Sequence, residues 1–130
     1  MPNPHPTEGE LAILRVLWDR RGACTVRDVH DALMRDKDTA YTTVLKMMTI
    51  MADKGLVVRD ESERSHRYTA VHPESLVQST LLADLMQRAF SGSALQLVQR
   101  ALAVDAASGE DLDAIAKLIA QAKSRRNNAS

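Results

Sequence analysis

The sequence predicts a mainly α-helical protein with one small β-hairpin. Apolar residues recur every three or four positions along most of the chain, which is the spacing of the buried side of an α-helix. Aromatic residues make up only 3% of the 130 residues, so a core must be built from aliphatic side chains and six methionines. A core of this kind favours packed helices over a β-sandwich or barrel.

The first two helices are predicted to follow residues 7 and 25. Each begins with a capping box, in which a side chain accepts a hydrogen bond from the backbone N–H of its partner three residues away. The two boxes are Thr7 with Glu10, and Thr25 with Asp28. Apolar residues then recur at helical spacing: Leu11, Leu14, Leu17 and Trp18 in the first helix, and Val26, Val29, Leu33 and Met34 in the second.

A third helix is predicted over residues 39–55, with Thr39 capping its start and Gly55 ending it in the left-handed conformation. At about 100° per residue, one side of this helix is apolar and is predicted to be core. That side carries Tyr41, Val44, Leu45, Met48, Met51 and Ala52. The opposite side is available for binding and carries Thr42, Thr43, Lys46 and Ile50.

The available side of this helix suits the major groove of DNA. Hydroxyl groups bond base edges there, and threonine methyls contact thymine methyls, so Thr42 and Thr43 are predicted to contact bases. Lys46 would contact a phosphate or a base. Tyr41 could donate its hydroxyl to a phosphate while its ring packs inward. For Ile50 two interpretations stay open, namely contact with a thymine methyl and contact with the C-terminal part of the protein.

A β-hairpin is predicted after the third helix. Leu56 and Val58 alternate with polar residues on one strand, as Tyr68 and Ala70 do on the other, across a polar turn. Helices followed by a hairpin in this order predict a winged helix-turn-helix domain over residues 1–73. The hairpin is the wing of this domain. Its two arginines, Arg64 and Arg67, are placed to contact phosphates. Three carboxylates of the wing would repel phosphates: Asp60, Glu61 and Glu63.

Residues 74–130 are predicted to form a second, helical domain. Pro73 suits the start of a helix, Ser91-Gly92-Ser93 interrupts it, and Ser108 with Asp111 caps the last one. Three helices of this size bury too little surface alone, and pairing with a second copy would cover their wide apolar faces. A symmetric homodimer is therefore predicted, in which the third helix of each copy, the recognition helix, binds one half of a palindromic operator. Its interface residues are Leu81, Leu85, Leu95, Val98, Leu102, Ile115 and Ile119.

The composition of the chain limits the classes of function that it can have. Lys plus Arg and Asp plus Glu both number 17, so no global basic surface marks a nucleic-acid binder, although a helix-turn-helix needs only a local cluster of donors. The alternative is therefore a winged-helix adapter that binds proteins and has no sequence-specific affinity for DNA. No apolar run approaches about 18 residues and no signal-peptide pattern is present, so we expect a cytoplasmic protein without membrane insertion.

Catalytic and metal-binding patterns are not found in the sequence. The four histidines lack metal-ligand spacing, and no glycine-rich phosphate loop occurs. The single cysteine, Cys24, excludes an intrachain disulfide or a thiolate cluster and is expected to act as a small buried apolar residue. We therefore expect no enzyme activity, no cofactor and no metal.

Several short stretches recur in one known family in the same order and spacing. They are Glu10, Leu14 and Leu17-Trp18; Ala40-Tyr41-Thr42-Thr43-Val44-Leu45; Lys54-Gly55-Leu56; Arg67-Tyr68; Ser91-Gly92-Ser93-Ala94-Leu95; and Leu97-Val98. Across roughly residues 7–122 the chain resembles the penicillinase repressors, the BlaI/MecI family of winged-helix regulators. The resemblance implies a homodimeric repressor on palindromic operators, often controlling genes for resistance to cell-wall antibiotics and for a membrane metallopeptidase that senses them.

The sequence also departs from this family. Thr42 and Leu45 stand where staphylococcal-type repressors carry Lys and Arg, so their operator sequence does not carry over. Those repressors are inactivated by cleavage of a bond that the resemblance places at Arg100-Ala101, where the residues differ. The last residues lack the cysteine-rich tail of copper-responsive relatives, so release through loss of the dimer is the expected mode.

Overall fold

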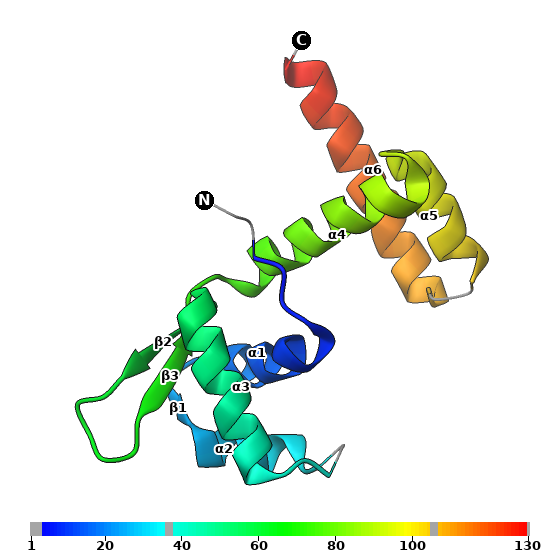
Figure 1. Ribbon diagram of the computed structural model, residues 1–130. Coiled ribbons are helices and arrows are strands. Elements are labelled where there is room, and N and C mark those ends of the chain that lie inside the picture. The colour runs from blue at the N-terminus through cyan, green and yellow to red at the C-terminus, as the bar shows by residue number, and fades with distance from the viewer. Residues whose placement is uncertain (1–3, 36–37, 105–106, 130) are drawn as a thin grey trace. The chain divides into compact units, whose positions relative to one another are not determined.

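The computed structural model describes residues 4–35, 38–104 and 107–129, which form six helices and three strands (Figure 1). In chain order they are α1 (Glu8–Arg20), β1 (Cys24–Thr25), α2 (Val26–Leu33), α3 (Tyr41–Lys54), β2 (Val57–Asp60), β3 (Arg67–Ala70), α4 (Glu74–Phe90), α5 (Ala94–Ala103) and α6 (Gly109–Ala129). The chain divides into two compact units, one ending at Ala83 and the other beginning at Asp84. The functional division after Pro73 stays a prediction.

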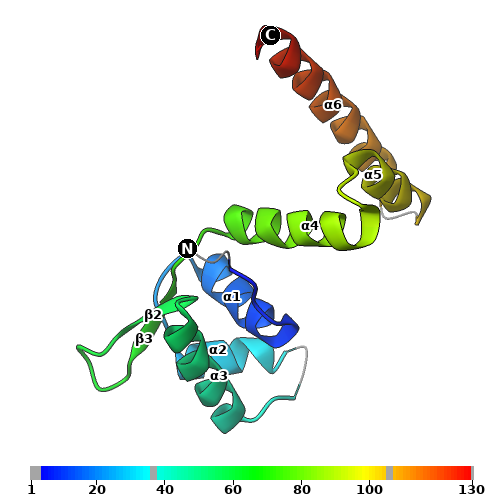
Figure 2. The same cartoon turned by 45° about the horizontal axis from the view of Figure 1, so that its top comes forward.

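The N-terminal unit is a winged helix-turn-helix. Its three strands form an antiparallel sheet in the order β1-β3-β2, with Cys24 opposite Tyr68 and Val57 opposite Ala70. The β2–β3 hairpin projects beyond the helical trio α1, α2 and α3 (Figures 1 and 2). This arrangement confirms the mainly α fold with a hairpin wing. It also contains a third short strand, β1, which the sequence did not predict.

The core of this unit is aliphatic, as the composition predicted. Cys24 is buried within it, which confirms its expected role as a small apolar residue. Tyr68 is the one aromatic side chain in the core cluster of the described residues. The other members of the cluster are Ile13, Leu14, Leu17, Val26, Val29, Val44, Met48, Met51, Leu56 and Val57. Trp18 lies at the edge, where its indole N–H donates to the backbone carbonyl of His72 at 3.0 Å.

The apolar side of α3 is narrower than predicted. Val44, Met48 and Met51 are completely buried, but Tyr41 and Leu45 are 39% and 42% exposed. These two residues stand at the edge of the helical stripe, where they line the hollow between α3 and the wing. The prediction that they belong to the core is therefore wrong.

The first strand of the wing departs from the predicted alternation, whereas the second follows it, with Tyr68 buried and Ala70 half-buried. Val58 is 60% exposed and Val57 is buried, so the prediction for Val58 is wrong. Leu56 is buried for another reason, because its N–H donates to the carbonyl of Met51 at 2.9 Å and closes the end of α3 after Gly55. Gly55 has φ of 81°, which confirms its predicted left-handed conformation. Val57 is consequently the one buried residue of β2, and Val58, Arg59 and Asp60 are exposed.

Capping accounts for where several helices begin. The Thr7–Glu10 and Thr25–Asp28 boxes are both formed, with N–H to oxygen distances of 2.9–3.2 Å. Ser108 and Asp111 pair in the same way before α6. The predicted cap at Thr39 is wrong, because α3 begins one residue later, with Ala40 as its N-cap and no side-chain cap bond. The Ala40 carbonyl accepts from the N–H groups of Thr43 and Val44 instead.

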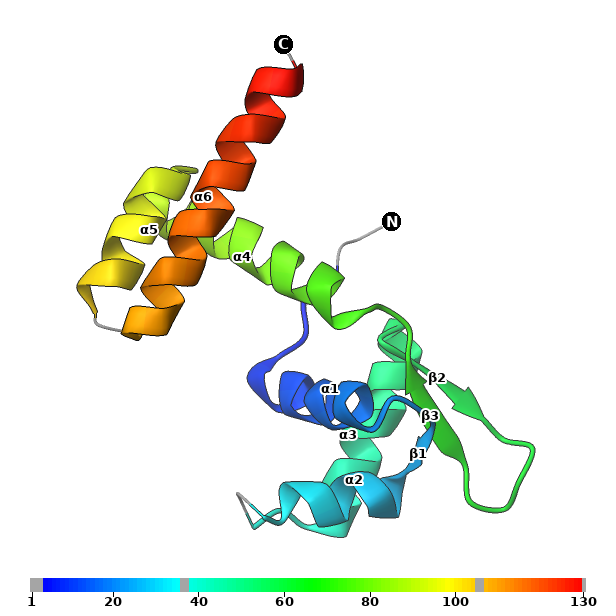
Figure 3. The same cartoon turned by 180° about the vertical axis from the view of Figure 1, so that it is seen from behind.

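The C-terminal helices leave their aliphatic side chains in contact with solvent. Figure 3 shows α5 and α6 from behind. These two helices contain no buried residue among those described, and Leu95 is 70% exposed. Of the residues predicted to form a dimer interface, Leu81 and Ile115 are half-buried. The others are exposed: Leu85, Leu95, Val98, Leu102 and Ile119.

One buried carboxylate joins the start of α1 to the end of α3. Glu10 is 4% exposed and accepts hydrogen bonds from the Thr7 N–H and, at 2.9 Å, from the ammonium of Lys54. Burial by itself would raise the pKa of Glu10, but the bonds from Thr7 and Lys54 outweigh it and hold that pKa below its ordinary value. The carboxylate therefore stays charged at neutral pH and stabilises the contact between the two helices.

Replacing Glu10 by glutamine should lower the free energy of unfolding by about 1–2 kcal/mol at neutral pH, because the amide keeps the cap but loses the charged bond to Lys54. With its pKa lowered by folding, Glu10 stabilises fully above about pH 4.3, and this contribution is lost as the pH falls through the lowered value. Urea unfolding followed by the fluorescence of the single tryptophan, Trp18, measures both effects.

The matched control is Glu61→Gln, which removes an exposed ion pair with Arg59 in the same unit. This change should cost less than about 0.5 kcal/mol. Equal stability of Glu10→Gln and the parent protein at neutral pH would show that the buried pair does not stabilise the fold.

Candidate nucleic-acid interface

The outward side of α3 is the first candidate surface. Thr42, Thr43, Lys46 and Ile50 are all exposed, opposite the buried Val44, Met48 and Met51. Residues 41–50 contain one basic residue and no acidic residue. This half of the helix therefore presents hydroxyl groups, methyl groups and one positive charge, with no carboxylate to repel a phosphate.

Exposed Tyr41 and Leu45 widen this surface on the side that faces the wing. The ring of Tyr41 was predicted to pack inward, but the residue is exposed. The guanidinium carbon of Arg27 lies 5.4 Å from the centre of that ring, and His30 meets it edge-on, with 5.7 Å between ring centres. Two side chains of α2 thus contact the ring of Tyr41, and the residue is 39% exposed.

The wing carries the second candidate surface, and its acidic residues are engaged within the wing. Glu61 pairs with Arg59 at 2.8 Å, and Glu63 with Arg67 at 3.7 Å. Asp60 accepts a hydrogen bond from the Ser62 N–H, which lowers the pKa of this carboxyl.

Arg64 and Arg67, the two wing residues predicted to contact phosphates, differ in their surroundings. The guanidinium of Arg67 is shared with Glu63, whereas Arg64 makes no ion pair with any residue that the structure describes. Arg64 is exposed and is therefore the wing residue that is better available to an anion.

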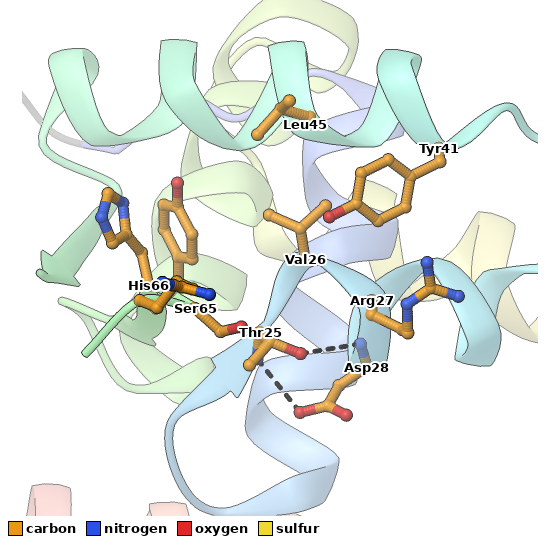
Figure 4. A pocket seen from close by; sticks show the side chains of 10 residues that line it. Thr25, Val26, Arg27, Asp28, Tyr41, Leu45, Ser65 and His66 are labelled. Carbon is orange, nitrogen blue, oxygen red and sulfur yellow. Dashed lines mark hydrogen bonds between the residues drawn. The ribbon is translucent and has the colours of Figure 1, made fainter.

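A hollow of about 380 Å³ separates α3 from the wing (Figure 4). It is lined by Thr25, Val26, Arg27, Asp28, Tyr41, Leu45, Arg64, Ser65, His66 and Tyr68. The hollow brings together Tyr41 and Arg64 of the predicted site residues. Thr42, Thr43 and Lys46 lie on the neighbouring surface of α3, and Arg67 is on β3.

Arg27 and His66 were missed in the sequence. His66 stands between Arg64 and Arg67 in the wing, and that position was the signal that could have found it. Arg27 is an isolated basic residue, and only the fold places residue 27 of α2 against residue 41 of α3. Among the described residues there is also no group of three metal-ligating side chains, and no helix is long and apolar enough to cross a membrane.

A helical trio followed by an antiparallel hairpin, with an exposed third helix beside an arginine-bearing wing, defines a winged helix-turn-helix protein. Residues 6–121 match the sequence model of the penicillinase repressor, and the chain belongs to this family, as its sequence resemblance predicted.

Two comparisons place the chain beside known relatives. It is 35% identical over 122 residues to the transcriptional regulator BlaI of Mycobacterium tuberculosis, in strains CDC 1551 / Oshkosh and ATCC 25618 / H37Rv, across 92% of this chain and 86% of the relative. The solution structure of the Bacillus licheniformis BlaI monomeric form in complex with the blaP half-operator matches with a TM-score of 0.49 and 21% identity. That match covers 58% of this chain and 90% of the other.

Replacing Lys46 by alanine should weaken binding to duplex DNA about tenfold without lowering the melting temperature, because the side chain points away from the core. A phosphate contact predicts similar losses on specific and non-specific DNA and a salt slope smaller by about one. A base contact predicts a larger loss on specific DNA. Fluorescence anisotropy across a salt series measures these effects, with Lys123→Ala in α6 as the control. Unchanged binding by Lys46→Ala would remove Lys46 from the interface.

Proposed function

We propose that this protein is a dimeric repressor of transcription that binds a palindromic operator in duplex DNA. The observation that carries this proposal is the exposed, carboxylate-free half of α3 beside a wing whose acidic residues are paired internally. Lys46, Thr42 and Thr43 would enter the major groove, and Arg64 and Arg67 would contact the phosphate backbone.

The neutral net charge is compatible with this function because the charges are distributed unevenly. Several carboxylates are occupied in caps and ion pairs, including those of Glu10, Asp28 and Glu61. The wing carries three arginines and three carboxylates, but Lys46 on α3 and Arg64 in the wing make no ion pair with any described residue, so these two local positive charges remain available to phosphates. Association with DNA depends on this local field and weakens steeply with salt.

An adapter that binds proteins is the second candidate function. The exposed Leu45 and Ile50 favour it, because aliphatic side chains on a helix surface are typical of protein interfaces. In the DNA-binding proposal the same side chains would contact thymine methyl groups. The two functions differ in salt dependence, since only the first requires phosphate contacts.

The C-terminal helices support the dimeric part of the proposal. Burying apolar surface is worth about 25 cal/mol per Å², and α5 and α6 leave several large aliphatic residues exposed. A second copy of the same surface would cover them and bring two recognition helices about 34 Å apart, which is one turn of DNA. The proposed interface comprises Leu81, Leu85, Leu95, Val98, Leu102, Ile115 and Ile119.

Loss of this dimer is the proposed route to release from DNA. Arg100 and Ala101 lie in α5, a helix without a buried side chain among the described residues, so local opening of α5 costs little. A cut between them would separate α6 from the rest of the chain. By analogy with the family, a membrane metallopeptidase sensor and genes for antibiotic resistance are the proposed upstream and downstream partners.

Selection from a pool of random duplexes should yield a palindrome whose half-sites are centred about 10 base pairs apart. Affinity for the selected duplex should fall by a factor of about 10³ or more between 50 and 200 mM salt, as expected for six or more phosphate contacts. Fluorescence anisotropy with purified full-length protein measures it. Failure to bind any duplex in low salt would favour the adapter function.

Replacing Leu85 by aspartate should convert the dimer to monomers or aggregates at micromolar concentration, because the substitution would bury an unpaired charge. Sedimentation velocity measures the mass. The matched control is Gln87→Asp, which adds a negative charge on the opposite side of α4, about 200° away. A parent protein that sediments as a monomer at this concentration would exclude the dimer.

A further inference from the structure

We propose that the hollow between α3 and the wing binds one phosphate group of the DNA backbone, and that Arg27 and Tyr41 are its principal ligands. This inference rests on the proposed DNA-binding function and assigns a binding role to Arg27, which lies on α2, outside the recognition helix and the wing. The hollow belongs to the N-terminal unit and is drawn in Figure 4.

The position of the hollow follows from the docking geometry. A protein that inserts α3 into the major groove and lays its wing along the adjacent groove must have a sugar–phosphate strand between these two elements. The hollow is the space between them, with Tyr41 and Leu45 on one side and Arg64, Ser65 and His66 on the other. A volume of about 380 Å³ is large enough for a phosphate group and part of its two sugars.

The lining of the hollow has the chemistry of an anion site. Arg27 and Arg64 supply guanidinium groups, Tyr41 and Ser65 supply hydroxyl donors, and His66 supplies an imidazole. Guanidinium groups bind phosphate oxygens through two parallel N–H donors, which a single ammonium does not provide. Three kinds of donor, from five residues, thus line one small space.

Asp28 is the one carboxylate in this lining, and it is occupied. It accepts a hydrogen bond from the Thr25 N–H at 3.0 Å, the main cause of its lowered pKa. In Figure 4 the carboxylate points toward Thr25, whose hydroxyl in turn accepts from the Asp28 N–H. The Asp28 carboxylate therefore caps α2, and the donors of Arg27 and Tyr41 remain available to a phosphate.

Arg27 and Tyr41 are already placed as a pair. The guanidinium carbon lies 5.4 Å from the centre of the phenol ring, and His30 supports the ring from another side. Arg27 is exposed and makes no ion pair with any described residue, so its donors are not taken by a carboxylate. Figure 4 shows the Tyr41 hydroxyl directed into the hollow. The contact therefore places the Arg27 guanidinium against the Tyr41 ring before DNA binds, which reduces the entropy lost on binding.

Three variants of the full-length protein test this site on the duplex selected above. Arg27→Ala should lower affinity about tenfold and reduce the slope of log K against log salt by about 0.9, the value for one phosphate. Arg27→Lys should restore the slope and part of the affinity. Tyr41→Phe should lower affinity severalfold with the slope unchanged, because it removes a neutral donor and keeps the ring. Arg15→Ala, at an exposed position of α1, is the control for loss of an arginine.

A scan of the duplex with single neutral methylphosphonates locates the phosphate. One position in each half-site should weaken the parent protein strongly and Arg27→Ala little, because that variant no longer binds there. A parent that binds the duplex while Arg27→Ala and Tyr41→Phe match it in affinity and slope would overturn the phosphate site alone. A parent that binds no duplex would overturn the proposed function and this site together. Tyr41→Phe, which preserves the packing, decides the matter if Arg27→Ala is unstable.

Discussion

The rotation of α3 about its own axis is the constraint on which the rest of the interface depends. Val44, Met48 and Met51 are completely buried, and they lie on a single line along the helix. Three anchored side chains leave the helix little freedom to turn, so Thr42, Thr43 and Lys46 must face outward. Methionine suits this role because its flexible chain fills irregular spaces between α1, α2 and the sheet. The exposed surface is thus a consequence of the packing beneath it.

Several carboxylates of the N-terminal unit have structural partners within the protein. Glu10 and Asp28 complete helix caps, Glu10 also pairs with Lys54, and Glu61 and Glu63 pair with wing arginines. Lys46 and Arg64 make no such pair with any described residue. The net charge of the whole chain does not distinguish between paired and unpaired groups, so it could not reveal these two cations.

Local signals in the sequence predicted much of the fold. The capping boxes and Gly55 were correct, because caps involve neighbours three residues apart and depend little on tertiary context. Predictions failed where tertiary packing decides which side chains are buried, namely for the width of the apolar side of α3 and for the buried positions of the first wing strand. Tyr41 and Leu45 fall at the edge of an apolar stripe, and Leu56 is buried by the end of a helix and not by a strand. Arg27 could not be found at all, since its partner lies fourteen residues away on another helix.

The bond from the Trp18 indole to the carbonyl of His72 bears on how related sequences can vary. A main-chain carbonyl is present whatever side chain follows it, so position 72 can accept many residues without loss of this contact. Position 18 has no such freedom, because a phenylalanine would fill the space but leave the carbonyl without its donor. Among homologues, tryptophan at position 18 should therefore persist while position 72 diverges, although the two residues are partners.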